Sequence, residues 1–329
     1  MKTAVVTGAT GFIGKAFSQY LLERGYKVYG VSRDVSKMKA LCTNGLLPVE
    51  ADFSQYPLLA KKISHADIFY HFAWDGPSGM KTSEPSIQLA NAEAACSALL
   101  QAAMMGCKKF VLAGTVAEVE VLEHLDKNIC HPRPACIYAT AKLAAEVMCK
   151  VLAGQHGIAF NCGLFANIMG PGDTSKRSTN SILSQFLKGQ PPKLVKGEGL
   201  NDWLYIKDAV RLIEAMGERG VNMKTYYIGH TDLWPLRTII EKARDVVAPE
   251  MKLDFGVLPD SFLTDYSYIS TTELYKDTGC KAEYNFEKSI TETAEWLKET
   301  SVKTANTGME SMQTLRDQER ERERERERM

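Results

Sequence analysis

Short apolar runs alternate with longer amphipathic runs through the first half of the chain. The apolar, β-rich runs predict strands at 4–6, 27–31, 67–72, 109–112 and 158–164. The runs between them with helical periodicity predict helices at 12–24, 84–105 and 138–156. Such alternation is typical of a parallel sheet with helices on both faces. We therefore expect an α/β fold built on a doubly wound parallel sheet.

The pattern loosens after about residue 165, where glycine and proline interrupt the chain repeatedly. A helix at 207–216 and a strand at 225–228 still resemble the first half. We therefore expect 1–165, completed by 207–229, to form a dinucleotide-binding domain. The segments 166–206 and 230–300 are predicted to form a smaller substrate-binding lobe, with the substrate in the cleft between the two parts.

The last segment, 301–329, has few apolar residues and ends in strict Glu-Arg repeats over 319–328. On a helix, opposite charges would fall at i,i+3 but like charges at i,i+4, so helix support is mixed. The composition favours a disordered charged tail. A partner-binding helix and a reading-frame artefact are the alternatives.

Composition excludes several classes of protein. The formal net charge is zero, with 45% hydrophobic and 24% charged residues, so we expect no binding to nucleic acid or to an anionic membrane. No apolar run approaches the ~20 residues that span a bilayer, and the N-terminus lacks the pattern of a signal peptide. The eight cysteines contain no Cys-x-x-Cys pair, which predicts reduced thiols in a cytoplasmic protein and no metal site.

A glycine-rich turn follows the first strand and opens the first helix. Gly8, Gly11 and Gly14 occupy it in the spacing Gly-x-x-Gly-x-x-Gly. Glycine permits a tight turn and close backbone approach to a pyrophosphate, and a helix N-terminus offers free N–H groups. The turn therefore predicts a dinucleotide site.

The end of the second predicted strand bears on the choice of cofactor. NAD-binding chains carry an acidic residue there that binds the ribose 2′-hydroxyl. Here Ser32 stands at that position and Arg33 follows, and an arginine pairs well with a 2′-phosphate. Asp34 is the next residue and could still bind the ribose, so NAD remains the alternative cofactor. We expect NADP, with NAD as the alternative.

Tyr138 and Lys142 lie four residues apart at the start of a predicted helix, so both project from one face. A nearby cation stabilises tyrosinate and lowers the pKa of a tyrosine. The pair therefore predicts a general acid/base for interconverting a hydroxyl group and a ketone.

With these motifs the chain resembles the extended short-chain dehydrogenases/reductases, in their NAD(P)-dependent nucleotide-sugar epimerase/dehydratase group. The resemblance covers about residues 1–300. It rests on 7–14, 52–53, 71–73, Asn91, 113–115, Tyr138 with Lys142, 167–172 and 202–208. It implies a nucleotide-sugar substrate and a homodimer formed by helices 84–105 and 138–156.

The resemblance also implies roles for individual residues. Thr115, Tyr138 and Lys142 would be catalytic, with Lys142 also binding the nicotinamide ribose. The cofactor would contact Gly8, Thr10, Gly11, Phe12, Ile13, Gly14, Arg33, Asp52, Phe53, Phe72, Ala73, Tyr138 and Lys142. Asn167 would meet the substrate's diphosphate, and Glu118 and Trp203 are further candidates for substrate contact. Trp203, like Trp74, has core packing as its alternative role, and His71 is expected to be a core histidine.

This sequence departs from the family pattern at positions that distinguish one reaction of the family from another. The 4,6-dehydratases carry Asp-Glu after the catalytic Ser/Thr, whereas Val116 and Ala117 stand here. Arginines of the family are replaced by Leu164 and Asn201. Lys176, Arg177, Lys193, Lys196 and Arg237 are candidates to supply their charge.

We expect an enzyme that transfers hydride reversibly at C4 of a nucleotide-linked sugar. A 4-ketoreductase is slightly favoured, because Arg33 points to NADP(H). A 4-epimerase is the main alternative. A reductase of a non-nucleotide carbonyl compound and a non-enzymatic dinucleotide sensor are further alternatives.

Overall fold

A seven-stranded parallel sheet forms the centre of the computed structural model, which describes residues 1–127, 132–259 and 264–301. Its order is β10-β6-β5-β4-β1-β2-β3. The strands are β1 (Thr3–Thr7), β2 (Lys27–Ser32), β3 (Leu47–Glu50), β4 (Ile68–His71), β5 (Lys109–Thr115), β6 (Ala159–Phe165) and β10 (Thr225–Ile228). The strand order reverses between β1 and β4, which is where doubly wound sheets bind ligands. The predicted fold class is confirmed.

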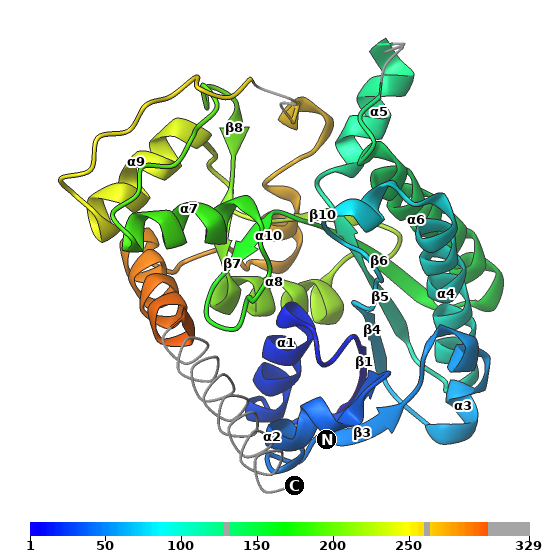
Figure 1. Ribbon diagram of the computed structural model, residues 1–329. Helices are drawn as coiled ribbons and strands as arrows, with labels where there is room; N and C mark the ends of the chain where they lie inside the picture. Colours follow the sequence, from blue (N-terminus) through cyan, green and yellow to red (C-terminus); the bar gives the residue numbers. More distant parts are fainter. Residues whose placement is uncertain (128–131, 260–263, 302–329) are drawn as a thin grey trace, which may run out of the picture.

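Helices cover both faces of this sheet (Figure 1). The face beside α1 (Phe12–Glu23) and α8 (Ile206–Arg219) has its own buried apolar cluster. A second cluster lies beneath α4 (Pro85–Met104) and α6 (Cys136–His156). All four residues of β4 are buried, as expected for a strand covered on both faces. The glycine turn before α1 and the start of α6 are therefore both held by helices that pack on this one sheet.

Shorter helices connect these elements. They are α2 (Lys39–Cys42), α3 (Leu59–Lys62), α5 (Glu118–Lys127) and the 3-10 turns Val35–Met38, Phe53–Leu58 and Met80–Ser83. The sequence pattern did not predict β3 or α5. β3 is a four-residue edge strand containing Pro48, and α5 carries charged residues along most of its length.

A second group of elements packs around its own apolar cluster, which includes Leu183, Phe186, Trp203 and Ile240. It contains α7 (Ser178–Leu187), α9 (Leu236–Val247) and a helix over 286–301. β7 (Asn167–Met169) pairs with β9 (Trp203–Tyr205), and β8 (Leu200–Asn201) with β11 (Trp234–Pro235). The domain boundaries given above stay a prediction. The predicted tail lies, Ser301 aside, outside the described residues.

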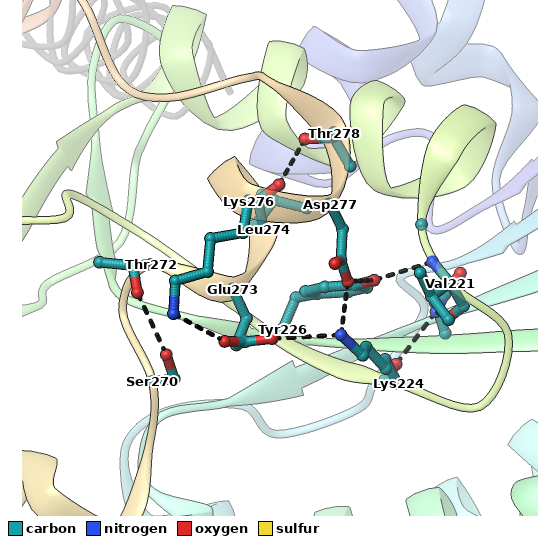
Figure 2. Close-up of polar contacts among 12 residues, drawn as sticks. Val221, Lys224, Tyr226, Ser270, Thr272, Glu273, Leu274, Lys276, Asp277 and Thr278 are labelled. Carbon is teal, nitrogen blue, oxygen red and sulfur yellow. Dashed lines mark hydrogen bonds and ion pairs between the residues drawn. The ribbon is translucent and has the colours of Figure 1, made fainter.

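Polar contacts fasten α10 (Glu273–Thr278) to the edge strand β10 (Figure 2). Lys224 Nζ lies 3.1 Å from a Glu273 oxygen and 2.7 Å from an Asp277 oxygen. The Tyr226 hydroxyl donates to Asp277 at 2.6 Å and accepts from the Val221 N–H at 2.8 Å. The chain that follows β11 is thereby joined to the main sheet. Across the described residues, no helix has the length and apolarity required to cross a membrane.

Candidate active site

A cavity of about 480 Å³ opens at the carboxyl ends of the central strands. Its walls combine the glycine turn, the end of β2, the segment after β4, the end of β5 and the start of α6. The predicted residues that line it are Gly8, Thr10, Gly11, Phe12, Ile13, Gly14, Arg33, Phe53, Phe72, Ala73, Thr115, Tyr138, Lys142 and Asn167. The structure therefore brings most of the predicted cofactor and catalytic residues into one cavity.

The glycine turn has a shape that only glycine permits. Gly8 has a φ of +68°, and a Cβ there would lie 2.9 Å from the backbone nitrogen of Ala73. A Cβ on Gly14 would lie 2.2 Å from the Gly8 carbonyl oxygen. No side chain caps the start of α1, so its first N–H groups face an open cradle. Such a cradle fits the pyrophosphate of a dinucleotide.

Thr7 joins β1 to β4 at the point where the two strands diverge. Its hydroxyl oxygen accepts from the N–H groups of Phe72 at 3.2 Å and Ala73 at 3.3 Å, and lies 2.9 Å from Nδ1 of His71. His71 is 1% exposed, and burial lowers its pKa to about 3. It is a neutral core histidine, as its position on an apolar strand led us to expect.

At the end of β2, Arg33 faces the cavity and Asp34 does not. The Asp34 carboxylate accepts from the Ser36 N–H at 3.0 Å and lies 3.4 Å from Lys37 Nζ. Ser32 Oγ lies 2.9 Å from Thr10 Oγ1, which links β2 to the glycine turn. Asp34, the acidic residue because of which NAD was kept as the alternative cofactor, is therefore engaged in local contacts.

Thr115, Tyr138 and Lys142 share one wall of the cavity. Lys142 Nζ donates to the Ala113 carbonyl at 2.7 Å and lies 3.7 Å from the centre of the Trp74 ring. The Trp74 ring meets Tyr138 edge to face at 6.1 Å. Trp74 therefore lines the site and holds the lysine by a cation–π contact, a role that its sequence position does not reveal.

The pKa of Tyr138 shifts in the opposite direction to the one expected from its spacing to Lys142. Burial raises it to about 12, a hydrogen bond with Thr115 opposes this, and the cation that lowers it is Arg177. Burial also lowers the pKa of Lys142 to about 8. The prediction of a lowered tyrosine pKa is wrong for this arrangement, because desolvation outweighs the neighbouring charge. Tyr138 is held as a neutral phenol, ready to donate a proton.

Three predicted contact residues lie outside the cavity wall. Trp203 is 3% exposed and packs in the second apolar cluster, so the structure favours its packing role. Asp52 caps the turn Phe53–Leu58, accepting from the N–H groups of Ser54 and Gln55. Glu118 is 2% exposed and accepts from the Thr115 N–H at 2.7 Å. Its carboxyl group therefore contacts the end of β5 rather than the cavity.

At the other end of the cavity, Asn167 Nδ2 donates to Asn201 Oδ1 at 3.0 Å. Both asparagines are thus engaged with each other where the family pattern has an arginine. Arg177, at the start of α7, lines the cavity. Among the described residues it has no ion-pair partner, which leaves its guanidinium available to an anionic substrate group. Of the five basic residues considered above, it is the one in the cavity wall.

Glu120, His124 and Cys136 place one potential metal-ligand atom each within 4.8 Å of one another, a cluster that linear spacing did not predict. The Arg133 guanidinium donates to both oxygens of Glu120, at 2.8 Å and 2.5 Å. A cation therefore already neutralises the carboxylate, which disfavours a metal ion beside it.

Comparison with known proteins gives one matching family model and several similar relatives. The model of the NAD dependent epimerase/dehydratase family matches residues 4–229. The dTDP-glucose 4,6-dehydratase of Streptomyces antibioticus is 25% identical over 242 residues, covering 68% of this chain and 71% of the relative. UDP-glucuronate 4-epimerase 1 of Arabidopsis thaliana is 22% identical over 330 residues, covering 89% and 76%.

Solved structures show the same architecture. The UDP-glucose 4-epimerase of Thermotoga maritima, with UDP-glucose, superposes with a TM-score of 0.73 at 20% identity, covering 91% of this chain and 99% of the other. The Bordetella bronchiseptica enzyme WbmF, in complex with NAD+, gives 0.74 at 19% identity, covering 92% and 94%. At these identities the likeness establishes the fold.

Proposed function

The chain belongs to the NAD-dependent epimerase/dehydratase family, and on this premise we propose that it transfers hydride reversibly at C4 of a nucleotide-linked sugar. The favoured direction is reduction of a 4-keto sugar. One observation carries the proposal: Tyr138 stands beside Thr115 in the cavity wall as a neutral phenol, with its pKa raised to about 12. A neutral phenol is the form that donates a proton to a carbonyl oxygen.

Each residue of this site is proposed to have its own role in the reaction. The Thr115 hydroxyl would hydrogen-bond the reacting oxygen, and the Tyr138 hydroxyl would donate its proton there. Lys142, fixed by the Ala113 carbonyl and the Trp74 ring, would bind the nicotinamide ribose. The bound dinucleotide would supply the hydride. The glycine cradle and Arg33 would hold its phosphates.

We propose NADP(H) as the preferred cofactor, because Arg33 faces the cavity and Asp34 is engaged elsewhere. An Arg33→Gln variant should bind NADPH about 10- to 100-fold more weakly, since a charge-assisted hydrogen bond contributes about 1.5–3 kcal/mol. Its affinity for NADH should not change. Calorimetric titration of both dinucleotides measures this, with Lys37→Gln as the control. Equal losses for both would refute the proposed 2′-phosphate contact.

A 4-epimerase is the second candidate, favoured by a UDP-glucuronate 4-epimerase relative that aligns over 89% of the chain. A 4,6-dehydratase is disfavoured although relatives carry that activity, because Val116 and Ala117 line the wall where proton-transferring carboxylates would stand. Releasing and identifying the cofactor of freshly purified protein separates the candidates. Tightly held NAD(H) would favour the epimerase, whereas an empty site that binds NADPH and reduces a 4-keto sugar nucleotide would favour the reductase.

Arg177 is proposed to supply the positive charge that Leu164 and Asn201 lack. An Arg177→Gln variant should raise KM for the nucleotide sugar about tenfold or more, since hydrogen bonds to charged groups contribute about 1.5–3 kcal/mol. Its kcat should fall less. Steady-state kinetics test this, with the neighbouring Lys176→Gln as the control. An unchanged KM would remove Arg177 from the substrate site.

A homodimer through α4 and α6 stays part of the proposal. Both helices expose large apolar side chains, with Leu89 62%, Met104 71%, Val147 53% and Val151 56% exposed. Exposed apolar side chains of this kind mark a candidate contact surface. Sedimentation at micromolar concentration tests it, and a monomer there would contradict the prediction. The cytoplasmic location likewise stays a prediction.

A further inference from the structure

A second carboxyl group lies buried behind the catalytic wall. Glu118 opens α5 and is 2% exposed. One of its oxygens, Oε1, accepts from the Thr115 N–H at 2.7 Å. A Cβ on Gly114 would lie 2.8 Å from this oxygen, so the strand is shaped around the carboxyl group. The other oxygen, Oε2, is buried and has no hydrogen-bond partner among the described residues.

The neighbour of Glu118 is a second buried carboxyl group, that of Glu146. It lies on α6 one turn after Lys142, is 6% exposed, and is near enough to Glu118 to raise the pKa of that carboxyl group. Lys150 Nζ donates to Glu146 Oε1 at 2.5 Å, and the Thr225 hydroxyl donates to the same oxygen. Two neighbouring carboxyl groups away from water disfavour double ionisation. One oxygen of Glu146 is already occupied by two donors, whereas Glu118 Oε2 has none among the described residues.

We propose that Glu118 and Glu146 share one proton at neutral pH, and that this acid pair positions Thr115 and balances the charge of Lys142. With the proton on Glu118, Oε2 becomes a donor to Glu146 and the unpartnered atom acquires a partner. Oε1 continues to accept from the Thr115 N–H. The pair then carries a single negative charge behind the wall that holds Lys142. The shared proton stands independently of the proposed function, whereas the positioning role rests on it.

The groups around Glu118 agree with this assignment. β5 contributes the Thr115 N–H, α6 contributes Glu146 and Lys142, and β6 contributes Cys162 beside the pair. Burial and the charge of Glu146 raise the pKa of Glu118 to about 8, against the Thr115 N–H and Lys142, which lower it. Neither carboxyl group lines the cavity, so the pair acts through the residues it holds.

The first test needs no substrate. In the folded protein Glu118 keeps its proton up to about pH 8, whereas in the unfolded chain it loses the proton near pH 4.5. The folded state therefore binds one more proton between these values, and the folded/unfolded ratio falls by up to about tenfold per pH unit as the pH rises through them. Glu118→Gln removes this dependence while keeping an acceptor for Thr115.

Denaturant unfolding of both proteins from pH 4 to pH 9 measures the difference. The wild type should lose stability relative to Glu118→Gln across this window, and parallel curves would overturn the shared proton. Glu214→Gln is the control, because Glu214 is 7% exposed but paired with Arg24 on the far side of the sheet. If the Glu118→Gln variant does not fold, infrared spectroscopy of the wild-type protein still tests the proposal. Absence of a protonated carboxyl band at neutral pH would refute the proposal.

The second test addresses the positioning role through the pH profile of kcat/KM. Above about pH 8, where Glu118 has lost its proton, its negative charge raises the pKa of both Tyr138 and Lys142. Glu118→Gln should therefore move the alkaline limb to lower pH by roughly half to one unit. If the alkaline limb of the kcat/KM profile does not move, Glu118 has a structural role only and the positioning role is wrong. If no sugar nucleotide is turned over at all, the proposed function fails, but the unfolding experiment still decides on the shared proton.

Discussion

Replacing Tyr138 with phenylalanine should lower kcat for hydride transfer by about two to four orders of magnitude, the usual contribution of a positioned acid/base. The phenol lies beside Thr115 in the cavity wall, and the two residues that follow Thr115, Val116 and Ala117, carry no carboxylate that could replace it. The ring stays in place against Trp74, so cofactor affinity should change little. Stopped-flow or steady-state absorbance of the nicotinamide measures the loss.

The control for this variant is Tyr29→Phe, which removes a phenol on β2 away from the cavity wall. It should keep full activity. A Tyr138→Phe variant that also keeps full activity would mean that the proton comes from elsewhere. It would revive the hypothesis of a dinucleotide sensor, whose function does not depend on an acid/base.

Replacing Gly14 with alanine should weaken dinucleotide binding about 10- to 100-fold, equivalent to about 1–3 kcal/mol. The new Cβ would lie 2.2 Å from the Gly8 carbonyl oxygen and 2.8 Å from its carbon. Both atoms belong to backbone, so the whole phosphate cradle has to move. Calorimetric titration with NADPH and thermal unfolding measure the two consequences, loss of affinity and loss of stability.

Gly154→Ala provides the matched control, because the added Cβ would meet only a Met223 methyl at 4.0 Å. This glycine lies within α6, where alanine is favoured by about 0.5–1 kcal/mol. The control should therefore be as stable as the wild type or more so. Unchanged affinity in Gly14→Ala would contradict the assignment of the turn as a phosphate cradle.

Much of the fold and of the cofactor cradle could be predicted from the sequence, because both depend on local patterns. Strand-helix alternation indicates a parallel sheet, and the glycines at 8, 11 and 14 report a backbone shape that other residues do not adopt. Arg33 lines the cavity because it directly follows a strand whose carboxyl end lies there. Its contact with a 2′-phosphate stays a prediction.

The burial of individual side chains and the resulting pKa shifts could not be predicted from the sequence, because they depend on packing between distant segments. Glu118 and Trp203 turn inward because of neighbours on α6 and α9, which spacing along the chain does not reveal. The pKa of Tyr138 follows from its burial rather than from its distance to Lys142 in sequence. One signal was available: Glu146 lies one helical turn after Lys142, so a second ionisable group on that face of α6 was predictable.

Because β10 is the edge strand of the sheet, the order of synthesis determines how long one edge of its partner strand stays unpaired. β10 pairs with β6, yet about 60 residues lie between them, which takes roughly 3–12 s at synthesis rates of about 5–20 residues/s. During this interval β7, α7 and α8 are synthesised while the edge of β6 away from β5 has no strand beside it. An unpaired edge invites pairing with another chain. The edge of β6 in the nascent protein therefore stays open to pairing with another chain until β10 is available.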